Sequence, residues 1–119
     1  MLNTLTLDSV NAFLKLCRKE IEKGNCYFVG TRHINIKGKV ISAKQALIDL
    51  GIMNIEDIWK YVSKLTKEDL VKVDFDYDST RDTNSEIFIF KKIINKKLVY
   101  IKLTMRTKGI ICISFHESY

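Results

Sequence analysis

Apolar and polar positions divide the chain into a helical first half and a strand-forming second half. In the first half, apolar residues recur three and four positions apart, at Val10, Phe13, Leu14, Cys17 and Ile21. This spacing predicts an amphipathic helix over residues 10–23, with Ser9 placed to cap its start and Gly24 placed after its end. The short apolar run 26–29 predicts a strand, and the polar residues 31–40 predict a loop or a small hairpin.

Three residue pairs with the spacing of capping boxes indicate where further helical segments begin. They are Ser42 with Gln45, Asn54 with Asp57, and Thr66 with Asp69. The first pair precedes a helix that Gly51 closes. The second precedes a helix from Ile55 to about Leu65, whose apolar stripe includes Trp59 and is expected in the core. The third opens one short turn.

From residue 71 the period of the pattern changes to two. Apolar positions alternate with charged ones, so that Val71, Val73, Phe75 and Tyr77 alternate with Lys72, Asp74, Asp76 and Asp78. Alternation of this kind predicts a half-buried strand. A polar loop at 79–85 follows, and then strands at about 86–93, 97–106 and 110–116. Turns are expected at Asn95-Lys96 and at Thr107-Lys108-Gly109.

The apolar pattern also predicts a register for the last hairpin. A three-residue loop with Gly109 in a left-handed conformation pairs Arg106 with Ile110. One face then carries Ile101, Leu103 and Met105 beside Ile111, Ile113 and Phe115. The other face carries Tyr100, Lys102, Thr104 and Arg106 beside Cys112, Ser114 and His116. A two-residue loop would mix polar and core positions, so we expect the three-residue loop and Tyr100 directly across from His116.

Length and composition indicate one domain spanning residues 1–119, and the helical pattern followed by strand patterns predicts an α+β fold with an antiparallel sheet packed by about three helices. The apolar content of 46% suffices for a core without disulfides, a metal or a cofactor. Cys17, Cys26 and Cys112 are odd in number and lack C-x-x-C spacing, so we expect reduced thiols. We find no signal-peptide layout and no apolar run of the ~20 residues that span a bilayer. A cytoplasmic protein with no membrane partner is expected.

Charge is distributed unevenly in the strand half. The net charge is +6, and the segment from Ile87 to His116 has no acidic residue. Its seven basic residues are Lys91, Lys92, Lys96, Lys97, Lys102, Arg106 and Lys108. Residues 74–86 hold five acids against Arg81 alone. Such a segment suits a polyanion such as RNA, and a solvated lysine-rich sheet face is the alternative.

One side of the predicted hairpin has residues suited to RNA cleavage. Cleavage without a metal needs a base for the 2′-hydroxyl proton, cations for the phosphate charge and an acid for the leaving 5′-oxygen. Imidazole exchanges protons near neutral pH, so His116 is the expected proton-transfer group, and Tyr100 can donate a proton or stack on a base. Lys91, Lys102 and Arg106 are the expected RNA-binding residues. An ordinary polar face remains the alternative.

Other chemistry is weakly indicated. The D-x-D-x-D run from Asp74 to Asp78 resembles the start of a calcium loop, but Ser79 and Ser85 occupy the positions that require Gly and Glu. We therefore assign the aspartates to the outward face of a strand and predict no metal site. His33 has no partner at metal-ligand spacing and is expected to be a solvated loop residue.

Several segments, taken in order, resemble one known family. They are ALIDLGIMNIEDIWKYVSKLTKEDLVK from Ala46, KKLVYIKLTMR from Lys96 and IICISFHES from Ile110. They resemble the motility quorum-sensing regulator (MqsR) toxin family, which has an L-[ST]-x-x-D-[FL]-x-K segment and a terminal hairpin of the form V-Y-[LVI]-K followed by V-I-S-F-K-E. The resemblance extends from the helix at Val10 to Glu117.

This resemblance implies a RelE-like fold and a metal-independent mRNA endonuclease, the toxin of a type II toxin–antitoxin pair. Its partners would be mRNA and a cognate antitoxin protein, with the ribosome left open. By position, the family's functional lysine, tyrosine and second lysine correspond to Lys72, Tyr100 and His116. The family's functional glutamine has no clear match, although Glu86 lies nearby, and the stretch 30–41 is longer than is usual. The alternatives are a non-catalytic RNA- or protein-binding module, or a degenerate toxin kept as an interaction partner.

Overall fold

Three α-helices and seven strands make up the part of the chain that the computed structural model describes, residues 4–30, 33–76 and 85–118. The helices are α1 (Thr4–Glu22), α2 (Ala43–Asp49) and α3 (Ile58–Ser63), with 3₁₀ turns at Ile55–Asp57 and Lys67–Asp69. The strands are β1 (Cys26–Phe28), β2 (His33–Ile36), β3 (Lys39–Ser42), β4 (Leu70–Asp76), β5 (Ser85–Ile94), β6 (Lys97–Arg106) and β7 (Gly109–Glu117). The predicted α+β class is confirmed.

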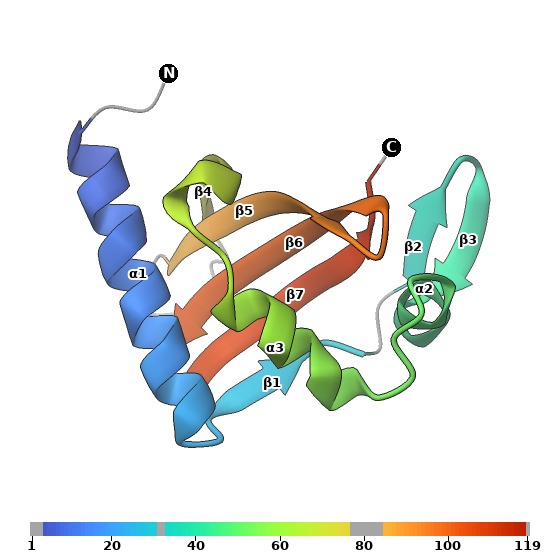
Figure 1. The fold of residues 1–119 in the computed structure, drawn as a ribbon, viewed down its shortest axis with the longest axis horizontal. Coiled ribbons are helices and arrows are strands. Elements are labelled where there is room, and N and C mark those ends of the chain that lie inside the picture. Colours follow the sequence, from blue (N-terminus) through green and yellow to red (C-terminus); the bar gives the residue numbers. More distant parts are fainter. Residues whose placement is uncertain (1–3, 31–32, 77–84, 119) are drawn as a thin grey trace.

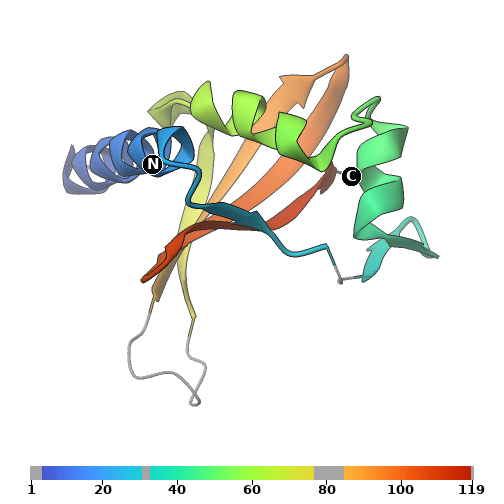
Figure 2. The same ribbon diagram turned by 90° about the horizontal axis from the view of Figure 1, so that it is seen from below.

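Five of these strands form one twisted sheet in the order β1-β7-β6-β5-β4, and β2 pairs with β3 in a separate hairpin (Figure 1). The large sheet is antiparallel except that β1 lies parallel to β7. Helices α1 and α3 cross one face of the sheet, and α2 stands beside the β2–β3 hairpin (Figure 2). No described helix is both long enough and apolar enough to cross a membrane.

The core lies between these helices and the inner face of the sheet. Phe13 of α1 stacks on Phe88 of β5 with ring centroids 3.9 Å apart, and Tyr61 of α3 lies 6.3 Å from Phe115 of β7. Trp59 is buried in the same cluster, as predicted. Burial of one large apolar side chain contributes about 1.5–3 kcal/mol, so these contacts are what hold the helices on the sheet.

One of the three predicted capping boxes, Thr66 with Asp69, is present, and Ser42 makes only half of another because the Gln45 side chain donates to Asp49 Oδ1 instead. The backbone N–H of Gln45 donates to Ser42 Oγ at 3.0 Å, and the backbone N–H of Thr66 donates to Asp69 Oδ2 at 2.9 Å. Asn54 makes no capping hydrogen bond, and its segment starts as a 3₁₀ turn before α3 begins. The helix predicted from Ile55 to about Leu65 is therefore α-helical only over Ile58–Ser63.

The start of the first helix differs from the prediction, whereas its end does not. Helix α1 is already formed at Thr4, so Ser9 lies inside it and caps nothing. Gly24 follows the end of α1 with a φ of +80°, a conformation that glycine adopts without steric cost. The helix predicted over residues 10–23 is thus longer at its N-terminus than the apolar stripe alone indicated.

A register shift changes which residues of β4 are buried. Leu70 pairs with Phe90 but Lys72 pairs with Ile89, so Val71 is an extra residue on β4. Val71 is 47% exposed, and Leu70 packs against the core in its place. The predicted buried position of Val71 is wrong because a bulge interrupts the alternation. Asp74 lies on the strand as predicted, whereas the loop expected at 79–85 falls almost wholly outside the described residues.

The turn between β6 and β7 is also different from the one predicted. Arg106 pairs with Gly109, so the loop has two residues rather than three. Cys112 consequently faces the core and is fully buried, whereas Ile111 and Ile113 line the opposite face. The predicted positions of these three residues are wrong because the loop length was inferred from an alternation assumed to be unbroken.

A bulge in β7 restores the predicted pairing beyond this point. Leu103 pairs with Cys112 but Lys102 pairs with Ser114, which makes Ile113 the extra residue. The thiol of Cys112 donates to the carbonyl oxygen of Ser114 at 3.3 Å and thereby satisfies a backbone group beside the bulge. After the shift, Tyr100 pairs with His116, as the sequence predicted.

Candidate functional site

The sheet face opposite the helices carries most of the predicted site residues. Strand pairing places Lys91, Tyr100 and His116 in one row, and Lys72, Ile89, Lys102 and Ser114 in the next. Paired residues on neighbouring strands project to the same side of a sheet. No described helix covers that side (Figure 2). We call it the open face.

Tyr100 and His116 form a stacked pair on the open face. Their ring centroids lie 5.2 Å apart with 20° between the ring planes. Nδ1 of His116 lies 2.9 Å from the carbonyl oxygen of Glu117. A carbonyl oxygen only accepts, so Nδ1 carries the hydrogen in this contact and Nε2 of the neutral ring keeps the lone pair. Nε2 of His116 can therefore accept a hydrogen bond in this tautomer.

Lys72 is not brought into contact with this pair. It lies on the edge strand β4, two strands away from Lys102, which corresponds to about 10 Å between backbones. Its Nζ is 3.8 Å from Asp74 Oδ2, and its side chain is 62% exposed. The three predicted catalytic residues thus divide into a compact pair and a separate lysine.

Ion pairs distinguish among the cations of the strand half. Lys92 Nζ lies 3.4 Å from Asp69 Oδ2, and Lys97 Nζ lies 3.6 Å from Glu117 Oε1. Lys91 and Lys102, both half-buried on the open face, have no carboxylate within ion-pair distance among the described residues. These two lysines therefore have charge available for an anion.

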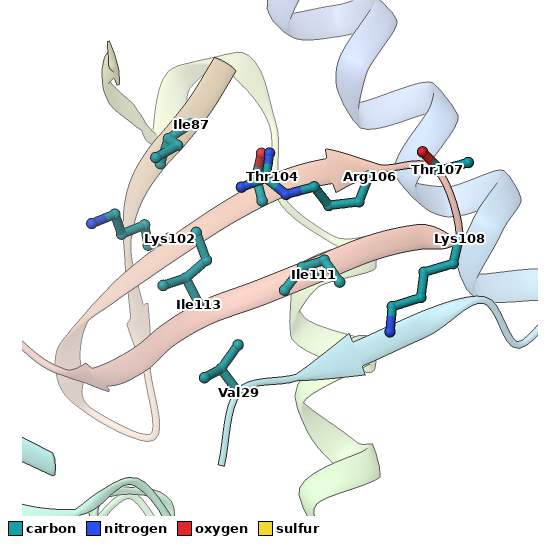
Figure 3. A pocket seen from close by; sticks show the side chains of 9 residues that line it. All are labelled: Val29, Ile87, Lys102, Thr104, Arg106, Thr107, Lys108, Ile111 and Ile113. Carbon is teal, nitrogen blue, oxygen red and sulfur yellow. The ribbon is translucent and has the colours of Figure 1, made fainter. Parts of the chain in front are cut away.

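A hollow of about 780 Å³ occupies the open face beside the β6–β7 turn (Figure 3). Its floor is aliphatic and its edge is basic. It is lined by Val29, Ile87, Lys102, Thr104, Arg106, Thr107, Lys108, Ile111 and Ile113. Thr104 is buried and donates to the carbonyl oxygen of Glu86 at 2.8 Å. The hollow thus combines an apolar surface, on which a flat ring can lie, with cations that suit phosphate.

Tyr27 extends the open face beyond this hollow, and the sequence alone did not single it out. It pairs with Ile111 across the β1–β7 ladder and is 40% exposed. Lys108 Nζ lies 5.0 Å from the centroid of its ring. An exposed aromatic ring beside a lysine is a common surface for stacking a nucleobase. No local pattern identifies Tyr27, because its neighbours on the sheet come from the end of the chain.

Glu86 does not replace the glutamine of the resembled family. Ile87 pairs with Thr104 on the open face, so Glu86 projects to the side of the helices. There it lines a surface depression with Phe13 and Leu16 of α1. Glu86 is therefore close to the expected position in the sequence but lies on the other face of the sheet from Tyr100 and His116.

His33 lies in a place that the sequence did not predict. Strand β2 brings it to a small cavity of about 190 Å³ between the β2–β3 hairpin and β7. The cavity is lined by Phe28, His33, Ile34, Asn35, Ala43, Ile113, Ser114, Phe115 and His116. Both histidines of the chain thus line one cavity. The expected solvation of His33 is confirmed, since its side chain is exposed, but the loop assignment is wrong because His33 begins β2.

The three cysteines are separate free thiols, as predicted. Burial raises the pKa of Cys17 to about 12 and raises the pKa of Cys112 well above its ordinary range. Burial, and then the carboxylate of Glu56, also raise the pKa of Cys26. Such thiols are poor nucleophiles, because the thiolate is the reactive form. Within the described residues, no three His, Cys, Asp or Glu side chains are grouped as metal ligands are.

Comparison with known proteins adds no relative to this picture. No protein-family model matches the chain, and no curated protein sequence matches it. The MqsR resemblance therefore depends on the short motifs quoted above, and the site must be judged on its own geometry.

Proposed function

We propose that this protein is a metal-independent endoribonuclease that cuts single-stranded RNA, and that it acts on mRNA as the toxin of a toxin–antitoxin pair. The observation that carries the proposal is the stacked Tyr100–His116 pair, with His116 Nε2 available as a base, on an open face that also carries Lys91 and Lys102. In this mechanism the RNA backbone lies across the open face. The lysines bind its phosphates, and His116 removes the 2′-hydroxyl proton.

Attack of the 2′-oxygen on the adjacent phosphorus forms a 2′,3′-cyclic phosphate and releases the 5′-oxygen, which must gain a proton. Cations beside the phosphate stabilise the charge that accumulates there in the transition state. Lys102 is adjacent to the pair, two residues along β6 from Tyr100. Lys72 is two strands from β6 and is better placed to bind a neighbouring phosphate than the one being cut.

Purified protein incubated with a labelled RNA in excess chelator tests the proposal. We expect products with 2′,3′-cyclic phosphate and 5′-hydroxyl ends, and loss of about 100-fold or more in rate for His116→Ala. Lys60→Gln on α3, at a side chain 74% exposed on the helix side, is the matched control and should cut at the wild-type rate. RNA that stays intact with wild-type protein, with and without ribosomes, would refute the nuclease.

The second candidate is a module of the same fold that binds RNA and does not cut it. The basic hollow favours it, because binding there does not require His116. Such a module would retain RNA in a binding assay and yield no product. The toxin role has a separate test: expression should arrest growth, and co-expression of a neighbouring open reading frame should relieve the arrest.

A further inference from the structure

The small cavity between the β2–β3 hairpin and β7 joins residues that lie far apart in the chain. His33 comes from the first strand of the hairpin, and His116 comes from the end of the last strand. The cavity also receives Asn35 and Ser114, and its apolar lining includes Phe28 and Phe115. It is therefore a polar pocket on an apolar support, next to the Tyr100–His116 pair.

We propose that His33 is the general acid of the cleavage reaction, paired with His116 as the general base. The inference rests on the proposed nuclease function and assigns the one proton transfer which that function leaves open. It also gives the β2–β3 hairpin a role, that of carrying the second proton-transfer group to the cavity beside His116.

The assignment of the two roles follows from the surroundings of each ring. Nδ1 of His116 is engaged with the carbonyl oxygen of Glu117, which leaves Nε2 to accept the 2′-hydroxyl proton. His33 belongs to a short two-stranded hairpin and is solvent-exposed, so its ring can be protonated from water between turnovers. Imidazolium is a stronger acid than a phenol by about 3 pKa units, so His33 suits the acid role better than Tyr100 does.

The proton balance of the step is complete with these two residues. The 2′-hydroxyl proton passes to His116 Nε2, the bond from the 2′-oxygen to phosphorus forms, and the bond from phosphorus to the 5′-oxygen breaks. The proton of the His33 imidazolium passes to the departing 5′-oxygen. The amide of Asn35 and the hydroxyl of Ser114 are hydrogen-bond donors that line the cavity and suit the phosphoryl oxygens. Water then returns both histidines to their starting states.

Other titratable groups around the cavity are few. Within the described residues, the two histidines are the titratable side chains in its lining, and Tyr100 stacks on His116 from outside it. No carboxylate of the described residues lines the cavity. The two histidines are therefore the groups of the lining that can transfer protons.

A pair of substrates tests the acid role of His33. One is an RNA with the natural 5′-oxygen at the scissile bond, and the other has sulfur in that position. A thiolate leaves without protonation, so loss of the general acid should matter for the oxygen substrate alone. We expect His33→Gln to slow the oxygen substrate by about 100-fold or more and the sulfur substrate by less than about threefold.

Two controls separate the possible failures. Lys39→Gln changes the same hairpin outside the cavity and should match wild type on both substrates. His116→Ala should be slow on both substrates, since the base is needed in each case. Equal slowing of both substrates by His33→Gln, or no slowing of either, overturns the inference while leaving the nuclease intact. A wild-type protein that cuts neither substrate overturns the proposed function itself.

Discussion

At the scale of single residues, burial changes the chemistry of the thiols most. Cys17 and Cys112 are 1% and 0% exposed, and burial disfavours the charged thiolate in both. In the unfolded chain each thiol titrates near its ordinary pKa, so the unfolded state loses protons first as the pH rises. Stability conferred by the protonated thiols is thus fully present below about pH 8.5 and falls at higher pH.

The free energy of unfolding should therefore decrease in alkaline solution. For Cys17 the decrease is about 1.4 kcal/mol per pH unit between its unfolded pKa and the folded value of about 12. Urea denaturation at pH 7, 9 and 10.5 measures it, and the Cys17→Ala, Cys112→Ala variant, in which other groups still titrate, should show a shallower decrease. A variant as steep as wild type would contradict this prediction.

At the scale of elements, the β6–β7 turn determines where β1 joins the sheet. Gly109 has a φ of +141°, and a side chain there would overlap the carbonyl group of Asn25. That same carbonyl oxygen accepts a hydrogen bond from the backbone N–H of Ile110 at 3.0 Å. The close approach therefore holds the start of β1 against β7, and Tyr27 reaches the open face as a result.

Two glycine substitutions compare a positive-φ glycine in open space with one that lies against the start of β1. Gly38→Ala places a methyl group in open space at a φ of +79°, so it should cost about 1 kcal/mol. Gly109→Ala adds the overlap with Asn25 and should cost about 3 kcal/mol or more. Denaturant unfolding of both variants measures the difference. Equal losses would mean that the approach of β1 contributes nothing.

At the scale of the whole molecule, the sheet separates its two faces by chemistry. One face is apolar and covered by helices, and the open face presents cations. Lys92 and Lys97 are ion-paired. Lys91 pairs with Tyr100 on the open face. The cations that line the hollow are Lys102, Arg106 and Lys108. Lys72 lies on the same face, so under the proposed function a single RNA strand that follows the open face would contact five cations.

The salt dependence of RNA binding should reflect that number. Five phosphate contacts predict a slope of about −3.5 for log K against log salt concentration with single-stranded RNA. Lys102→Gln should make the slope shallower by about 0.7, whereas Lys60→Gln on α3 should leave it unchanged. Titrations with an uncleavable 2′-deoxy-substituted strand at several salt concentrations measure both. A slope near zero would place binding elsewhere.

Much of the fold could be predicted because its signals are local. The strand expected over residues 97–106 matches β6, and the pattern around Trp59 correctly indicated a buried helix. The Tyr100–His116 pairing was also predicted, although by way of the wrong loop. The loop error and the bulge at Ile113 cancel beyond Ser114, which is why the pairing is correct despite the misplaced residues nearer the turn.

The sequence by itself determined that helices come before the main strands and that cations are concentrated in the strand half, whereas the pairing of Tyr100 with His116 also depends on the bulge at Ile113. The first two are set by neighbours a few residues apart. Only the tertiary structure decided that Cys112 is buried, that Glu86 faces the helices and that His33 shares a cavity with His116. The physical reason is that bulges and contacts between distant strands depend on how whole surfaces pack together. The spacing of apolar residues along one segment carries no information about that packing.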